Sequence, residues 1–168
     1  GLGCEIAFKL AKKKFHVVII GRSIKGLKNT FDKIDNINEK CTIVQLDLCQ
    51  DNCAELIEKQ VGKIKGNVEV IVNNAGIGIF KNVEMLSINE WQKMISLNLT
   101  AAFLLTKLYV PKMKKNKRGI LLYINSVAGK KGYPFPSGYV ASKFALRGFA
   151  ESVRGEVRTE GIKVVSIF

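Results

Sequence analysis

The side chains best suited to chemistry in this sequence lie near the ends of apolar runs. Tyr139 and Lys143 are four residues apart, so a helix through them places both on one face. Ser126 closely follows the apolar run 119–124, and the motif Asn-Asn-Ala-Gly at 73–76 follows another such run. A phenol, an ammonium and a hydroxyl brought together in this way can exchange a proton with an oxygen atom of a bound molecule.

The four-residue motif is the most informative of these features. Composition predicts about 0.004 chance occurrences of Asn-Asn-Ala-Gly, against about half an occurrence of Tyr-x-x-x-Lys. Taken singly, each residue also has a structural explanation: Ser126 as a cap at a strand end, Tyr139 as an amphipathic surface residue, and Asn73 and Asn74 as turn residues. The conjunction of all of them favours a site.

Helix-like and strand-like segments alternate along the whole chain, without an internal repeat or a low-complexity linker. The periodicity predicts helices at 4–14, 24–37, 54–64, 87–111 and 139–160, and strands at 16–20, 42–48, 68–72, 119–124 and 163–168. Ser87 to Glu90 form a capping box that begins the fourth helix. This alternation predicts a doubly wound α/β fold with a parallel sheet, in a single domain over 1–168. Such folds bind ligands beyond the carboxyl ends of the strands.

Composition argues against a disordered or a fibrous protein. With 168 residues, 47% of them hydrophobic and 24% charged, the chain is long enough to fold without a disulfide or a metal. The net charge of +13 indicates either an anionic partner or lysines scattered over helix surfaces. We favour scattered lysines and no nucleic acid, because no aromatic-interleaved basic stripe is present.

The cysteines and the apolar runs bear on the compartment. The four cysteines contain no Cys-x-x-Cys pair, which predicts free thiols in a reducing, cytoplasmic setting and no metal site. No apolar run reaches the roughly 18 residues of a membrane span, so membrane association is not expected of this segment. An organelle or a membrane tether elsewhere in the protein stays open.

In this order and on these elements, the motifs resemble the classical short-chain dehydrogenase/reductase family, and the resemblance covers the whole chain. Gly1-Leu2-Gly3 is similar to the tail of the family's glycine-rich turn, and 73–76 is similar to its Asn-Asn-Ala-Gly motif. The family's four catalytic residues correspond to Asn98, Ser126, Tyr139 and Lys143. The resemblance implies a Rossmann-type, three-layer α/β/α fold and an NADP(H)-dependent oxidoreductase acting on a carbonyl or a secondary alcohol.

The resemblance implies a role for each of the four residues. Tyr139 is the general acid and base, which exchanges a proton with the oxygen of the carbonyl or alcohol. Lys143 stabilises the tyrosinate and binds the nicotinamide ribose, while Ser126 stabilises the carbonyl oxygen. Asn98 supports a proton relay through its backbone carbonyl; an inward-facing Asn could instead tie down a neighbouring backbone segment.

The residues after the strand at 16–20 predict the choice of cofactor. An acidic residue there would bind the adenosine ribose of NAD, but the sequence has Arg22 and Ser23. A guanidinium suits a 2′-phosphate, so we expect NADP(H) rather than NAD(H), although Arg22 could also be an ordinary exposed loop residue. The resemblance adds cofactor contacts at Gly1, Leu2, Asp47, Leu48, Asn74, Ala75, Gly76, Tyr139 and Lys143. It places Asp47 at the adenine amino group.

The resemblance also implies which family elements this segment lacks. The family has a first strand before the part that corresponds to residue 1, and a substrate loop and a C-terminal strand after residue 168. We therefore expect unpaired strand edges at 16–20 and 68–72, and we expect the 168 residues alone to be poorly stable and inactive. The two long helices of the family imply a homodimer or homotetramer.

The substrate and two other function classes stay open. The apolar stretch 132–136 favours a hydrophobic carbonyl, and lipid-like carbonyls, small hydroxy acids and a 3-oxoacyl thioester are all compatible with the resemblance. A catalytically inactive dinucleotide-binding or scaffold fragment is the main alternative to an enzyme. A nucleic-acid binder is the second alternative, and only the net charge supports it.

Overall fold

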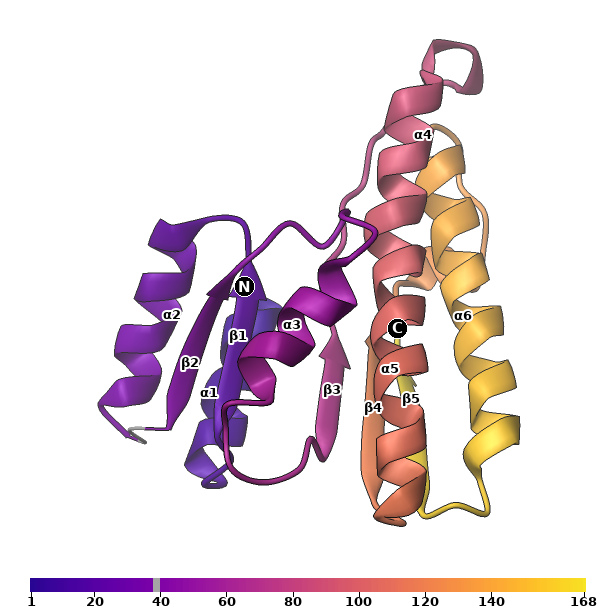
Figure 1. Ribbon diagram of the computed structural model, residues 1–168. Helices are drawn as coiled ribbons and strands as arrows, with labels where there is room; N and C mark the ends of the chain where they lie inside the picture. The colour runs from indigo at the N-terminus through magenta and orange to yellow at the C-terminus, as the bar shows by residue number, and fades with distance from the viewer. Residues whose placement is uncertain (38–39) are drawn as a thin grey trace. The chain divides into compact units, whose positions relative to one another are not determined.

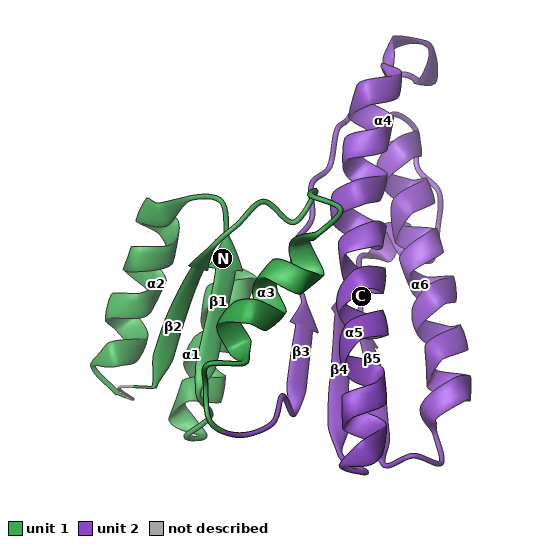
Figure 2. Cartoon of the chain, in the orientation of Figure 1, with its two compact units in different colours: residues 1–65 green, residues 66–168 purple. Residues whose placement is uncertain are grey.

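The computed structural model describes residues 1–37 and 40–168 (Figure 1). The chain forms two compact units, which comprise residues 1–65 and residues 66–168 (Figure 2). Each unit contains parallel strands and helices in alternation, which confirms the α/β class. The single-domain assignment over 1–168 stays a prediction.

Unit 1 is a two-stranded parallel sheet with three helices. Its elements are α1 (Leu2–Lys12), β1 (Val17–Gly21), α2 (Ile24–Asp35), β2 (Cys41–Gln45) and α3 (Cys53–Val61). β1 pairs with β2 in register from Val17 opposite Cys41 to Gly21 opposite Gln45. A core of buried apolar side chains joins α1, β1 and α2: Ala7, Ala11, Val17, Ile19, Leu27 and Ile34. Val17 and Ile19 of β1 are thus buried against helices, whereas Val18 and Ile20 on the other face are half-buried.

Unit 2 is a three-stranded parallel sheet in the order β3-β4-β5. Its strands are β3 (Val70–Asn73), β4 (Gly119–Ile124) and β5 (Ile162–Ile167), and its long helices are α4 (Ile88–Ile95), α5 (Ala101–Lys115) and α6 (Ser137–Val157). Single 3₁₀ turns cover Val83–Met85 and Val127–Gly129. The capping box predicted at the start of α4 is present, with Ser87 Oγ accepting from the Glu90 N–H and the Glu90 carboxylate accepting from the Ser87 N–H.

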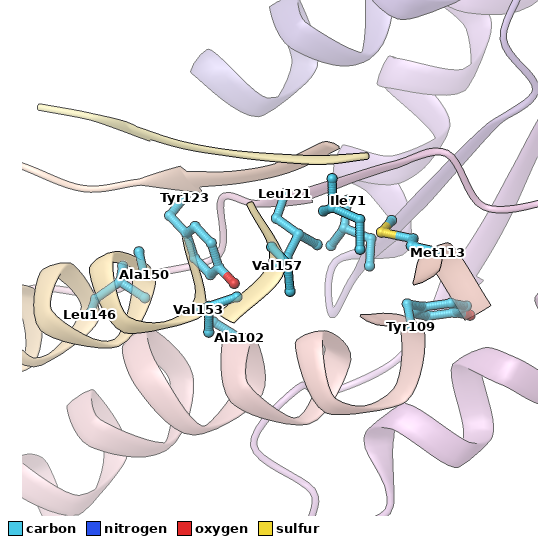
Figure 3. Close-up of a cluster of buried hydrophobic side chains, with 11 residues drawn as sticks. Ile71, Ala102, Tyr109, Met113, Leu121, Tyr123, Leu146, Ala150, Val153 and Val157 are labelled. Carbon is cyan, nitrogen blue, oxygen red and sulfur yellow. The ribbon is translucent and has the colours of Figure 1, made fainter. Parts of the chain in front are cut away.

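The core of unit 2 lies between the strands and helices α5 and α6. Figure 3 shows Leu121 and Tyr123 of β4 beside residues from both helices. The Tyr123 hydroxyl shares a 2.7 Å hydrogen bond with Thr106 of α5, so this buried phenol is paired. This packing fixes where α6 begins relative to the end of β4, and therefore where the candidate catalytic residues lie.

The helical segment that begins at Ile88 differs in two ways from the single helix predicted at 87–111. A π-helical turn at Ser96–Thr100 separates α4 from α5, so one wide turn interrupts the α-helical pattern. Such turns need tertiary support and occur often at functional sites. The helix also continues past Pro111 to Lys115, because the flanking Tyr109 and Met113 are buried in the core and outweigh the missing backbone hydrogen bond.

Among the described residues, one helical run could span a membrane by the test of length and composition alone, although it contains no uninterrupted apolar run of that length. Residues 88–116 are long and apolar enough to do so by length and composition, a test that core helices of soluble proteins also pass. Met94, Ala102 and Tyr109 of this run are buried within the unit. At these three positions, the apolar side chains are explained by their place in the core of unit 2.

Strands β1 and β3, for which an unpaired edge was predicted, each pair with a single strand among the described residues. Among the described residues, β1 pairs with β2 alone and β3 pairs with β4 alone. One edge of each strand therefore carries backbone groups without a strand partner, which agrees with the expectation for 16–20 and 68–72.

Candidate active site

Unit 2 brings the four predicted catalytic residues to the carboxyl ends of β3 and β4. Ser126 follows β4, and Tyr139 and Lys143 lie in the first two turns of α6. Ser126 and Tyr139 line the same pocket, and the Lys143 ammonium lies 5.8 Å from the centre of the Tyr139 ring. The helical spacing of Tyr139 and Lys143 thus places the two groups close to one another, as predicted.

Lys143 is a buried cation, with only 4% of its surface exposed. Its ammonium donates a 2.8 Å hydrogen bond to the carbonyl oxygen of Ile124, the last residue of β4. Burial lowers the pKa of Lys143, because the charged form loses its hydration. A lysine held this way offers a positive charge at a fixed place in a poorly hydrated setting, where its effect on a neighbouring phenol is greatest.

Ser126 begins the short 3₁₀ turn at Val127–Gly129, and its hydroxyl oxygen accepts a 3.1 Å hydrogen bond from the Ala128 N–H. This bond orients the side chain and uses a lone pair of the oxygen. Among the described residues no acceptor is found for the Ser126 hydroxyl proton, so the proton is available to an oxygen atom in the pocket. That is the geometry expected of a donor to a carbonyl.

Asn98 lies in the π-helical turn and is 1% exposed. Its side-chain oxygen accepts from the Ile77 N–H at 2.8 Å, and its side-chain nitrogen donates to the Ile77 carbonyl, also at 2.8 Å. The side chain therefore ties down a neighbouring backbone segment, which was the structural alternative for this residue. The relay through the Asn98 backbone carbonyl involves a different atom and stays a prediction.

The Asn-Asn-Ala-Gly motif lies beside these residues. A Cβ atom added at Gly76 would lie 3.2 Å from the Asn98 side-chain oxygen and 3.6 Å from the Lys143 ammonium, so the motif is in close contact with both. Asn74 is exposed and Ala75 is half-buried. The buried Asn73, which sequence reasoning did not place at the cofactor, has two side-chain atoms that no described residue pairs. Unpaired buried amide groups are costly, so Asn73 is a position where a further polar partner would be stabilising.

The pocket shared by Ser126 and Tyr139 has a volume of about 690 Å³ and is mostly apolar. Its walls include the predicted stretch Tyr133, Pro134, Phe135 and Pro136. Phe80 also lines it, with its ring centre 6.0 Å from that of Tyr139, although no sequence pattern singled this residue out. The pocket is large enough for a drug-sized organic molecule.

The predicted adenosine-side residues form a group of their own in unit 1. Gly1 and Leu2 begin α1, Arg22 and Ser23 follow β1, and Asp47 and Leu48 follow β2. The guanidinium of Arg22 lies 3.9 Å from the carboxylate of Asp47, and both side chains are partly exposed. Ser23 caps α2 by accepting from the Gly26 N–H at 3.2 Å. Because parallel strands end at the same edge of a sheet, these groups lie together at one end of unit 1.

Three of the cysteines, Cys4, Cys41 and Cys53, are free thiols. Burial raises the pKa of Cys41 to about 11, so this thiol is a poor nucleophile at neutral pH. Among the described residues no group of three or more His, Cys, Asp or Glu side chains is arranged to hold a metal ion. The cysteines therefore add no second chemistry to the site.

Comparison with known proteins identifies what this arrangement resembles. The family model described as "short chain dehydrogenase" matches residues 1–168. Human retinol dehydrogenase 8 is 38% identical over 158 residues, which is 91% of this chain and 50% of that protein. The ketoacyl reductase HetN of Nostoc sp. is 35% identical, over 98% of this chain and 57% of that protein. This chain thus spans about half the length of the curated relatives it matches.

A solved structure gives the same result for the fold. A metagenomic short-chain oxidoreductase in complex with NADP superposes with a TM-score of 0.94 at 30% identity, covering 99% of this chain and 75% of that one. The Rossmann-like α/β fold predicted from the sequence is thereby confirmed.

Proposed function

Since this chain belongs to the short-chain dehydrogenase family, we propose that it transfers a hydride between a nicotinamide cofactor and a carbonyl or secondary alcohol. The observation that carries the proposal is the pocket in unit 2. It holds the Ser126 hydroxyl and the Tyr139 phenol, with the buried Lys143 ammonium beside the tyrosine ring. Few reactions need a proton donor, a second hydrogen-bond donor and a fixed cation around one oxygen atom.

The protein's own residues supply the proton chemistry. Tyr139 gives a proton to the carbonyl oxygen in reduction and takes it back in oxidation. Lys143 stabilises the phenolate by its charge and holds the nicotinamide ribose, and Ser126 donates a hydrogen bond to the oxygen as negative charge develops there. Asn98 holds the backbone at Ile77 and supports proton supply through its carbonyl. When bound, the nicotinamide supplies or accepts the hydride.

We assign NADP(H) as the preferred cofactor, with NAD(H) as the alternative. Arg22 follows β1 with no acidic residue beside it in the chain, and its guanidinium suits a 2′-phosphate. The neighbouring Asp47 lies 3.9 Å from it, a distance at which an exposed ion pair contributes little, so the guanidinium can turn to a phosphate at small cost. Gly1, Leu2, Ser23 and Leu48 are the other adenosine-side contacts, and Asn74 to Gly76 serve the nicotinamide side.

The pocket walls support an apolar carbonyl as substrate. Phe80, Tyr133 and Phe135 supply aromatic surface, and no charged side chain lines the pocket within the described residues. A lipid-like carbonyl therefore fits better than a small hydroxy acid, whose carboxylate would lack a partner. A 3-oxoacyl thioester stays the narrower alternative, because its reacting end is uncharged.

We also propose an oligomeric state and a cellular compartment for the protein. The outward faces of α5 and α6 carry the exposed Phe103 and Phe144, which favours a homodimer or homotetramer built on these helices. A cytoplasmic site of action is proposed from the free thiols of Cys4, Cys41 and Cys53 alone.

The experiment is NADPH oxidation by the full-length protein over a panel of apolar ketones and aldehydes, with Tyr139→Phe as the matched variant. Removing one hydroxyl deletes the proton donor while keeping the ring, so we expect turnover in the parent and a loss of at least about 100-fold in the variant. A variant as active as the parent would remove the acid–base assignment. Cofactor binding without turnover on any carbonyl would favour the inactive, dinucleotide-binding alternative.

A further inference from the structure

Ser142 is a buried hydroxyl that the proposed chemistry does not use. It lies in α6 between Tyr139 and Lys143 and has 0% of its surface exposed. Its oxygen is 2.9 Å from the side-chain nitrogen of Asn98 and 2.7 Å from the backbone carbonyl oxygen of Tyr139. The hydroxyl therefore connects the helical turn that carries the acid–base pair to the π-helical turn.

The hydrogen bonds of Asn98 determine which atom donates in each contact. Its side-chain oxygen accepts from the Ile77 N–H, so the other end of the amide is the –NH₂ group, which has two protons. One proton goes to the Ile77 carbonyl and the other goes to Ser142 Oγ. The single proton of Ser142 is then left for the Tyr139 carbonyl. Each donor proton in this series of hydrogen bonds has one acceptor. Asn98 donates to Ser142, and Ser142 donates to the Tyr139 carbonyl.

These bonds join three segments that are far apart in the sequence. Asn98 lies 21 residues from Ile77 and 44 residues from Ser142. The start of α6 has no side-chain hydrogen bond from its N-cap residue, Pro136. The link from Asn98 through Ser142 to the Tyr139 carbonyl therefore ties the first turns of α6 to the π-helical turn by a side chain of the helix itself.

We infer that Ser142 is a positioning residue, which holds the Tyr139 turn of α6 against Asn98; the inference rests on the proposed function. Without the hydroxyl, a buried N–H of Asn98 has no acceptor and the Tyr139 turn loses its link to the rest of the site. The phenol then departs from its place beside Ser126 in the pocket. Because misplacement by about 1 Å can cost about 100-fold in rate, we expect kcat of Ser142→Ala to fall by roughly 10- to 100-fold.

The test is a double-mutant cycle in the full-length protein, with kcat measured per cofactor-binding site so that unfolded molecules do not count. If Ser142 acts through Asn98, Ser142→Ala lowers kcat at least about 10-fold in the parent but no more than about 2-fold in an Asn98→Ala background. Ser152→Ala, at an exposed position of the same helix, is the control and leaves kcat unchanged.

Ser142→Cys separates the hydrogen bonds from the space that the side chain fills. The thiol occupies the site but is a weak donor and acceptor, so its kcat should fall as that of the Ala variant does. Equal losses in both backgrounds, or a Cys variant as active as the parent, would assign Ser142 to packing and overturn the inference. If Tyr139→Phe abolishes turnover but Ser142→Ala does not lower it, this inference alone is overturned. If the unsubstituted protein shows no turnover that depends on Tyr139, both the proposed function and this inference are overturned.

Discussion

Gly129 is the residue whose substitution should separate the proposed catalytic groups most directly. It ends the 3₁₀ turn that begins at Ser126, and a Cβ atom there would lie 2.5 Å from the side-chain oxygen of Asn125 and 2.9 Å from the backbone oxygen of Lys143. Both distances are below the closest approach that carbon and oxygen normally make. In Gly129→Ala, therefore, the turn and α6 must move apart.

The size of the effect follows from these contacts. Forcing a methyl group into a packed site costs roughly 1–3 kcal/mol of stability. The lower entropy of the unfolded chain offsets roughly 0.4–1 kcal/mol of that cost. The Asn125 oxygen that must move accepts from the Ser126 N–H at 3.0 Å, so the displacement reaches Ser126 as well as Lys143. We expect a Tm several degrees below that of the parent and a kcat reduced by roughly 10- to 100-fold.

Gly132→Ala is the matched control. A Cβ atom there meets nothing within 4 Å, so the same chemical change in the same connecting segment should leave stability and kcat close to the parental values. Thermal melting followed by circular dichroism, and NADPH oxidation by the same preparations, measure both quantities in the full-length protein. A Gly129→Ala variant that melts and turns over like Gly132→Ala would refute the claim that this turn packs against Lys143.

Two further variants test the cofactor and the buried cation. Arg22→Ala should lower kcat/KM for NADPH by roughly 10- to 100-fold, the usual worth of a charge-assisted hydrogen bond, and leave NADH within about 3-fold; equal losses with both cofactors would remove the NADP(H) assignment. Because burial lowers the pKa of Lys143, the unfolded chain binds this proton more tightly, so stability rises with pH between the folded and unfolded pKa values. Lys143→Met removes that penalty and should abolish turnover while raising Tm below this window, with a gain that shrinks as the pH approaches about 10.4; a gain that is the same at every pH would contradict this reasoning.

Local rules of helix and strand geometry were enough to predict much of the site. The four-residue spacing of Tyr139 and Lys143 determines that they share a helix face, whatever the helix packs against. The Ser87–Glu90 capping box involves only neighbouring residues and is present as predicted. The alternation of β-branched runs with amphipathic segments likewise predicted parallel strands.

The features that sequence did not reveal depend on contacts between distant residues. The π-helical turn at Ser96–Thr100 has no signature in its own residues, and Asn98 within it is held by Ile77 and Ser142. Phe80 reaches the pocket from a loop without periodicity, so neither a helical nor a strand pattern could mark it. The helix persists beyond Pro111 because burial of Met113 outweighs the local preference to stop.

Hydride transfer itself is best tested by following the label of NADPH deuterated at the transferring position of the nicotinamide. With an apolar ketone and the full-length protein, the account predicts deuterium on the carbinol carbon of the product alcohol, and no product above background with Tyr139→Phe. NADPH consumption that leaves no deuterium on that carbon, or labelled product formed equally well without the Tyr139 hydroxyl, would contradict it.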